Sequence, residues 1–141
     1  MGRILCIDYG RARIGTAYSD ESCSFAFPFV VFPKHKKIEL TYREIQSKIS
    51  TIGTFDLLLI GLPLLLSGQE GEMALEAKAF GNGLADFLSI PPLFWDERLS
   101  SSQADRVLKE GNLSRKERAK RSDTMAATLI LQNYISFKNR G

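Results

Sequence analysis

The sequence has few of the residues that disulfide frameworks, imidazole metal centres and membrane spans require. Its 141 residues include two cysteines and one histidine, and no apolar run approaches the roughly 18 residues that cross a bilayer. A metal site with several imidazoles is therefore excluded, and a Ser-His-Asp triad would depend on His35, which lies in a charged segment. The N-terminus also has no signal-peptide pattern, so the sequence predicts a cytoplasmic protein with no membrane partner.

The excess of positive charge is small. Nineteen Lys and Arg residues against sixteen Asp and Glu give a formal net charge of +3. Much of the positive charge is concentrated at residues 115–121, with a smaller group at 34–37. A basic helical face is often only solvated, so the charge makes nucleic acid a candidate partner and no more.

The chain reads as three strands followed by alternating helices and strands. The expected elements are strands over 4–8, 14–19 and 25–32, a helix over 38–52, a strand over 56–63, a helix over 67–87, a strand over 91–97, and helices over 99–108 and 114–134. Pro28 places the third strand at an edge, and Ser67 with Glu70 forms a capping box that should open the helix over 67–87. This order predicts one α/β domain over residues 1–141, with the first strand central in a mixed sheet flanked by helices.

The first strand ends in a carboxylate. Ile4 to Ile7 form a continuous apolar run, typical of a strand buried on both faces, and Asp8 follows directly. An isolated ionised carboxylate at such a position would cost several kcal/mol, so a cation or hydrogen-bond donors are expected beside it. An alternative is that Asp8 only starts an Asx turn before Gly10.

Two further carboxylates are candidates for the same site. Glu97 ends the strand over 91–97, and Asp123 lies on the final helix on the same face as Ala127 and Ile130. Carboxylate oxygens suit Mg²⁺ or Mn²⁺, and two such ions can promote phosphodiester hydrolysis. The sequence therefore predicts a metal-dependent nuclease with Asp8, Glu97 and Asp123 as catalytic and metal-binding residues.

The neighbours of these acids leave alternatives open. Asp96 should point to the opposite face from Glu97, although a bulge in the strand would exchange their roles. Lys116 and Lys120 lie two turns and one turn before Asp123, where they could meet substrate phosphates. Lys120 could instead form a simple i,i+3 ion pair with Asp123.

Three stretches, in order along the chain, match the pattern of a known family. They are residues 7–20, which begin IDYG and end RIGTAYSD, residues 60–63 (IGLP) with 68–71, and residues 96–100 (DERLS) with 123–127 (DTMAA). In these stretches the chain resembles the YqgF (RuvX) proteins, Holliday-junction-resolvase-like nucleases of bacteria within the ribonuclease H-like superfamily.

The resemblance implies a ribonuclease H-like fold and a cellular role. The expected fold is a five-stranded mixed sheet of order 3-2-1-4-5 with strands 1–3 antiparallel. The implied role is maturation of the 5′ end of pre-16S rRNA by the metal-dependent acidic site formed by Asp8, Glu97 and Asp123. Basic candidates for nucleic-acid contacts are Arg11, Arg13 and Arg98, which match family positions, together with Arg115, Lys116 and Lys120 of the basic helix.

The chain departs from the family pattern at two places. Where the family usually has a polar segment that contains Asp, this chain has Leu64 to Ser67. This difference puts in question any substrate or metal contact by that loop. Ser100 replaces a Thr and keeps a hydroxyl group. Neither change affects the three acids.

Other functions compete with the pre-rRNA nuclease. A Holliday junction resolvase or other structure-specific DNA endonuclease would require a dimer for symmetric cutting, whereas the sequence predicts a monomer or weak homodimer. A non-catalytic nucleic-acid-binding module would gain support if one acid were misplaced. An actin-like or sugar-kinase-like ATPase would need a second lobe, for which 141 residues leave no space.

Overall fold

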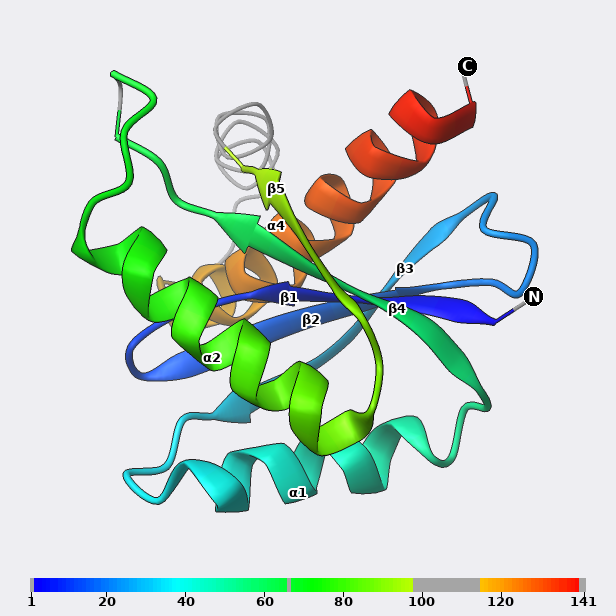
Figure 1. Cartoon of the computed structure of the whole chain (residues 1–141), viewed down its shortest axis with the longest axis horizontal. Coiled ribbons are helices and arrows are strands. Elements are labelled where there is room, and N and C mark those ends of the chain that lie inside the picture. Colours follow the sequence, from blue (N-terminus) through cyan, green and yellow to red (C-terminus); the bar gives the residue numbers. More distant parts are fainter. Residues whose placement is uncertain (1, 66, 98–114, 140–141) are drawn as a thin grey trace.

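The computed structural model describes residues 2–65, 67–97 and 115–139, and the backbone alone for 115–123 (Figure 1). The strands are β1 (Arg3–Asp8), β2 (Arg13–Ser19), β3 (Ala26–Pro33), β4 (Phe55–Leu62) and β5 (Pro92–Asp96). The helices are α1 (Ile38–Ile49), α2 (Glu72–Leu88) and α4 (Arg115–Asn139), and the helix expected over 99–108 lies outside the described residues.

The strands form one mixed sheet. Their order is β3-β2-β1-β4-β5, with β1 antiparallel to β2, β2 antiparallel to β3, and β4 parallel to both β1 and β5. This confirms the predicted order 3-2-1-4-5 and the antiparallel arrangement of the first three strands. β3 is an edge strand, as Pro28 predicted.

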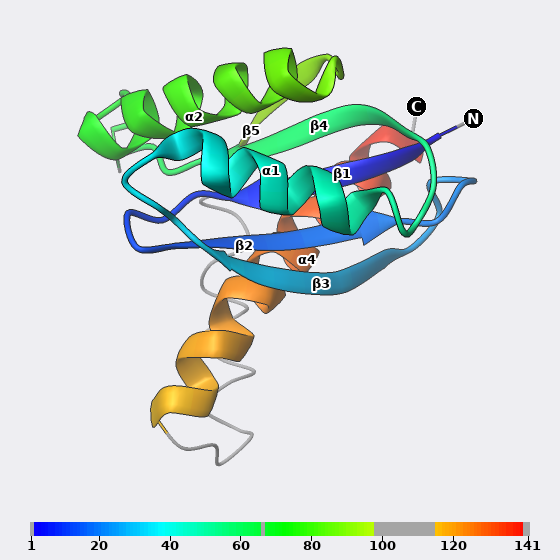
Figure 2. The same ribbon diagram turned by 90° about the horizontal axis from the view of Figure 1, so that it is seen from below.

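Helices cover both faces of the sheet (Figures 1 and 2). α1 and α2 lie on one face and α4 crosses the other. Side chains alternate between the two layers along β1, because Leu5 and Ile7 belong to the α1 and α2 core and Ile4 and Cys6 to the α4 core. The four residues are at most 2% exposed, so the prediction that β1 is buried on both faces is confirmed.

The pairing of β2 with β3 shifts register between Gly15 and Ala17. The fully buried Thr16 lies at this shift, where its hydroxyl donates to the Val30 carbonyl and accepts from the Val30 N–H. The Thr16 hydroxyl thus satisfies the Val30 backbone groups where the β2–β3 pairing is irregular, and it helps to hold the edge strand β3 on β2.

The start of α2 differs from the prediction. The helix begins at Glu72 after Gly71, and no side chain caps it, so the capping box of Ser67 and Glu70 is wrong. The Ser67 hydroxyl instead accepts a hydrogen bond from the Gln69 N–H, and Glu70 forms an ion pair with Lys78 of α2. The extended backbone at Gly71 delays the first helical turn, which separates the helix from its expected cap. Across the described ranges, no helix has both the length and the apolar character needed to span a membrane.

Candidate active site

Asp8 and Glu97 lie on the α4 face of the sheet at the carboxyl ends of their strands. Asp8 is the last residue of β1 and follows the alternation of Ile4 and Cys6 toward α4. Glu97 comes directly after β5, and its backbone N–H donates to the Leu62 carbonyl at 3.2 Å. The backbone pairing of β5 with β4 therefore continues as far as Glu97.

The two carboxyl groups contact each other. Burial raises the pKa of Glu97, a hydrogen bond with the Asp8 carboxyl group lowers it, and the negative charge of Asp96 raises it; the net shift is upward. Burial and the charges of Asp8 and Glu97 also raise the pKa of the Cys6 thiol. A pair of adjacent, partly buried carboxyl groups favours a bound proton or a cation between them.

The register of β5 separates Asp96 from this pair. Asp96 is paired with Leu62, with no shift along the β4–β5 ladder. Trp95, one residue earlier, packs in the α4 layer with Tyr134, so the regular alternation directs Glu97 to the α4 face and Asp96 to the other. The structure contains no bulge that would exchange the two acids within β5.

Asp123 lies on α4, but its side chain is outside the described part of the chain. Its helix position is four residues before the buried Ala127 and seven before the buried Ile130, so it shares their stripe. In Figure 1 the first half of α4 lies toward the end of the sheet where β1 stops, and Figure 2 shows its first turns beyond the β3 edge. The role of Asp123 as a third acid of the site therefore stays a prediction.

The donor atoms of the pair suit a hard divalent cation. Carboxylate oxygens are the ligands that Mg²⁺ and Mn²⁺ prefer, and a bound cation would stabilise the ionised form of Glu97 that burial disfavours. Among the described side chains, no group of three or more His, Cys, Asp or Glu residues is close enough to hold a metal ion. A third acidic ligand would have to come from a residue such as Asp123.

Arg11 is held on the opposite side of the sheet, over α2. Its guanidinium donates to both oxygens of Glu76, with an Nη2 to Oε2 distance of 2.7 Å, and lies 3.6 Å from Glu72. The Tyr9 hydroxyl donates to Glu76 as well, at 3.1 Å. This cluster of Tyr9, Arg11 and Glu76 was not predicted from the sequence. The i,i+4 spacing of Glu72 and Glu76 is the signal in the sequence that could have indicated an acidic helix face.

The cluster has clear electrostatic effects. The hydrogen bonds from Arg11 lower the pKa of Glu76, while burial and the bond to Glu76 raise the pKa of Tyr9 to about 12. Glu76 is thus an ionised carboxylate with a cation supplied by the protein itself. The turn that follows Asp8 is thereby attached to α2.

The remaining basic candidates are only partly described. Arg13 begins β2 on the surface, paired with Pro33 of β3, and the Lys34 N–H donates to the Ala12 carbonyl beside it. Arg98 and the side chains of Arg115, Lys116 and Lys120 lie outside the described residues. Their proposed contacts with nucleic acid stay predictions.

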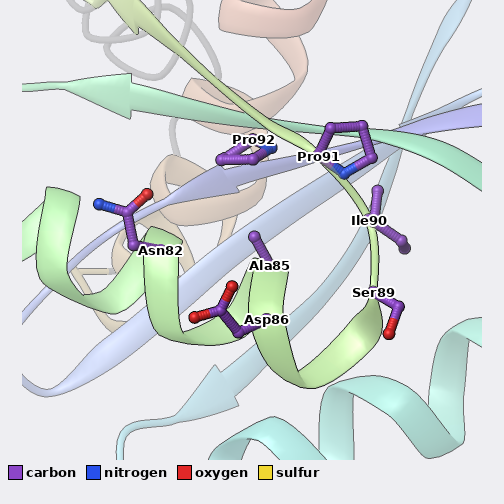
Figure 3. Close-up of a pocket in the computed structure, with 7 residues that line it drawn as sticks. All are labelled: Asn82, Ala85, Asp86, Ser89, Ile90, Pro91 and Pro92. Atoms are coloured by element: carbon purple, nitrogen blue, oxygen red, sulfur yellow. The ribbon is translucent and has the colours of Figure 1, made fainter.

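A separate cavity lies at the other end of β5. It has a volume of about 350 Å³ and is lined by residues including Asn82, Asp86, Ser89 and Pro91 (Figure 3). These residues belong to the end of α2 and the segment that leads into β5, whereas Asp8 and Glu97 lie at the carboxyl ends of the strands. The cavity is therefore distinct from the carboxylate site.

Comparison with known proteins relates this geometry to a family. A family model described as "RuvX: Holliday junction resolvase" matches residues 2–136. A protein of Protochlamydia amoebophila is 41% identical over 138 residues, covering 94% of this chain and 92% of that protein. A protein of Syntrophomonas wolfei is 41% identical over 135 residues, covering 94% and 93%. Both carry the provisional name of pre-16S rRNA nuclease.

Solved structures show the same fold at low sequence identity. T. thermophilus RuvC in complex with a Holliday junction substrate aligns with a TM-score of 0.57 at 13% identity, over 99% of this chain and 97% of that one. The fowlpox virus Holliday junction resolvase aligns with a TM-score of 0.60 at 9% identity, over 96% and 99%. The sheet order, these likenesses and the match over nearly the whole sequence lead to one conclusion. The chain belongs to the RuvX (YqgF) family and has its ribonuclease H-like fold.

Proposed function

We propose that this protein is a divalent-metal-dependent nuclease that matures the 5′ end of pre-16S rRNA. The observation that carries the proposal is the contact between the Asp8 and Glu97 carboxyl groups at the ends of β1 and β5, with the raised pKa of Glu97. The provisional names of relatives at 41% identity support the choice of RNA. We further propose that residues 1–141 form one nuclease domain, cytoplasmic and monomeric or weakly dimeric.

The acidic residues would hold the metal. Asp8 and Glu97 supply carboxylate oxygens from two strands, and Asp123 is the proposed third ligand from α4. Mg²⁺ or Mn²⁺ bound there, as two ions, would lower the pKa of a coordinated water and stabilise charge on a leaving phosphodiester oxygen. The protein's own contribution is to keep the two carboxyl groups together on a rigid sheet, where the burial that raises the pKa of Glu97 favours a bound cation.

Basic residues near the site would hold the substrate backbone. Arg13, at the surface where β2 begins, is the described candidate for a phosphate contact, and Arg98, Arg115, Lys116 and Lys120 are proposed for the same role. Arg11 was predicted to join them. In this structure its guanidinium binds Glu76, so a phosphate would have to compete with that ion pair.

A Holliday junction resolvase is the second candidate. The description of the family model and the fold shared with two resolvases favour it. It would require a two-fold dimer to cut both strands symmetrically. A non-catalytic binding module is a third possibility, which would be supported if Asp123 proved not to reach the acidic pair.

Parallel cleavage assays would distinguish these functions. A labelled pre-16S rRNA fragment and a four-way DNA junction would be incubated with Mg²⁺, Mn²⁺ or EDTA, using wild type, Asp8→Asn and the control Asp86→Asn. Asp86 is exposed on α2, remote from the site. We expect metal-dependent RNA cleavage that Asp8→Asn abolishes and Asp86→Asn keeps.

Each of the other results has a definite meaning. Cleavage of the junction alone would favour the resolvase. Binding of both substrates without cleavage would favour the binding module. Unchanged activity in Asp8→Asn would refute the acidic site.

A further inference from the structure

The two acids of the site come from strands that are not neighbours. β4 lies between β1 and β5. Adjacent strands are about 4.8 Å apart, so the backbones that carry Asp8 and Glu97 are separated by roughly 10 Å. Their carboxyl groups can meet only if a side chain crosses above β4 on the α4 face.

The residue of β4 at this crossing is Gly61. Ile7 is paired with Ile60, so Gly61 is level with Asp8, and Leu59, two residues earlier, packs in the α4 layer. A Cβ atom on Gly61 would lie 2.7 Å from Oε2 of Glu97 and 2.8 Å from Cδ1 of Ile130, closer than real Cβ atoms approach. The space that a side chain would fill is occupied by the Glu97 carboxylate and by α4.

The backbone of Gly61 does not itself require glycine. The two described glycines with positive φ are Gly53 and Gly68, and Gly61 lies within a regular β-strand. Glycine is needed at position 61 because it lacks a side chain, and not because of its conformational freedom. The Glu97 N–H also donates to the Leu62 carbonyl, so β4 holds the backbone of Glu97 while Gly61 leaves room for its side chain.

We propose that Gly61 is a positioning residue that lets the Glu97 carboxylate cross β4 to reach Asp8 and so sets the affinity of the site for a divalent cation. This inference rests on the proposed function, because it assumes that the carboxyl pair binds metal. The competing explanation is that Gly61 only allows α4 to pack closely through Ile130.

Two variants separate these explanations. Gly61→Ala introduces a methyl group against both Glu97 and Ile130. Gly61→Ala with Ile130→Val removes the Cδ1 atom and so relieves the contact with α4 while leaving the contact with Glu97. This double variant also serves as the test if the single variant fails to fold.

A matched control exists on the other face of the sheet. A Cβ atom on Gly81 of α2 would lie 2.8 Å from Cγ1 of Ile60, the residue that precedes Gly61. Gly81→Ala therefore introduces a contact of the same severity in the same part of the sheet, but in the core that α2 covers.

The experiment measures Mn²⁺ binding by calorimetry, thermal unfolding in EDTA and cleavage of the RNA fragment. We expect Gly61→Ala to weaken Mn²⁺ binding by about 10- to 100-fold. Adding Ile130→Val should restore the melting temperature but not the affinity, and Gly81→Ala should bind Mn²⁺ within about twofold of wild type.

Recovery of wild-type affinity in the double variant would overturn the proposal and leave Gly61 a role in packing only. Unchanged affinity in Gly61→Ala would overturn it too. A wild-type protein that neither binds Mn²⁺ nor cleaves nucleic acid would instead refute the proposed function.

Discussion

Both faces of the sheet have an apolar core, but only the face under α4 also carries the pair of carboxyl groups. The face under α1 and α2 is filled with large side chains, where the ring of Phe80 lies 5.4 Å from Tyr9 and 5.3 Å from Tyr42. The face under α4 also contains large buried side chains such as Leu131, beside the small and fully buried Cys6. The polar chemistry of this pair is thus confined to one face of a sheet that is apolar on both.

Each face has a glycine that makes room for a neighbour. Gly81 on α2 admits the side chain of Ile60, an apolar group that completes a core. Gly61 on β4 admits the carboxylate of Glu97. The lack of a Cβ atom thus allows close apolar packing at Gly81 and leaves room for a carboxylate at Gly61.

The carboxylates on the two sides also differ. The Arg11 guanidinium lowers the pKa of Glu76, whereas burial raises the pKa of Glu97. Glu76 has its cation within the protein, so its role is to attach the turn after β1 to α2. Glu97 lies where an external cation would be stabilising, which is typical of a functional site.

The largest effect should follow from removing the charge of Glu97. Glu97→Gln should reduce RNA cleavage by about 10³-fold, because metal-assisted charge stabilisation contributes several kcal/mol and each 1.4 kcal/mol changes the rate tenfold. Asp96→Asn, on the opposite face, should stay within about threefold of wild type. Single-turnover cleavage rates at saturating Mg²⁺ would measure both, and equal losses would show that the acids share one role.

Truncation in the aromatic layer should affect stability and not the chemistry. Phe80 is 4% exposed and contacts Tyr9 and Tyr42, so Phe80→Ala should cost about 3–5 kcal/mol of unfolding free energy. Urea unfolding monitored by circular dichroism would measure the loss. Mn²⁺ affinity, measured well below the melting temperature, should match wild type, and a large loss of affinity would show that the two faces are coupled.

Stability without metal should depend on pH through Glu97. Because its pKa is raised in the folded state, its stabilising contribution is present below its ordinary value of 4.5 and is lost as pH rises through the folded-state value. In EDTA, Glu97→Gln should therefore match wild type near pH 4 and become more stable than wild type as pH rises toward 8. If the melting temperatures of the two proteins changed in parallel across this range, the raised pKa of Glu97 would be contradicted. With saturating Mn²⁺ at pH 8, wild type should instead be more stable than Glu97→Gln.

The smallest effect should come from Arg11. Its ion pair with Glu76 is exposed, so Arg11→Gln should change the melting temperature only slightly. If Arg11 stays with Glu76 when RNA binds, the salt dependence of RNA affinity should equal that of wild type. Arg13→Gln should lower the slope of log K against log salt by about one, the value of one phosphate contact. A similar decrease in Arg11→Gln would show that Arg11 leaves Glu76 to bind phosphate.

The sequence determined the elements whose signals are local. Apolar runs and helical spacing indicated each described strand and helix, and the carboxylate after Ile4 to Ile7 marked the end of the central strand. The family motifs then supplied the sheet order. The start of α2 was predicted wrongly because capping depends on the conformation of residue 71, which the pattern of Ser67 and Glu70 does not specify.

Only the tertiary structure decided which groups meet. Asp8 and Glu97 were expected to share a site, but how they meet depends on β4, which separates their strands and has no side chain at residue 61. Glu76 reaches Arg11 because α2 packs beside the turn after β1. These contacts join residues more than sixty positions apart. Periodicity reports which face a residue occupies within its own element, whereas strand order, register and the space left by a missing Cβ atom fix its partners on other elements.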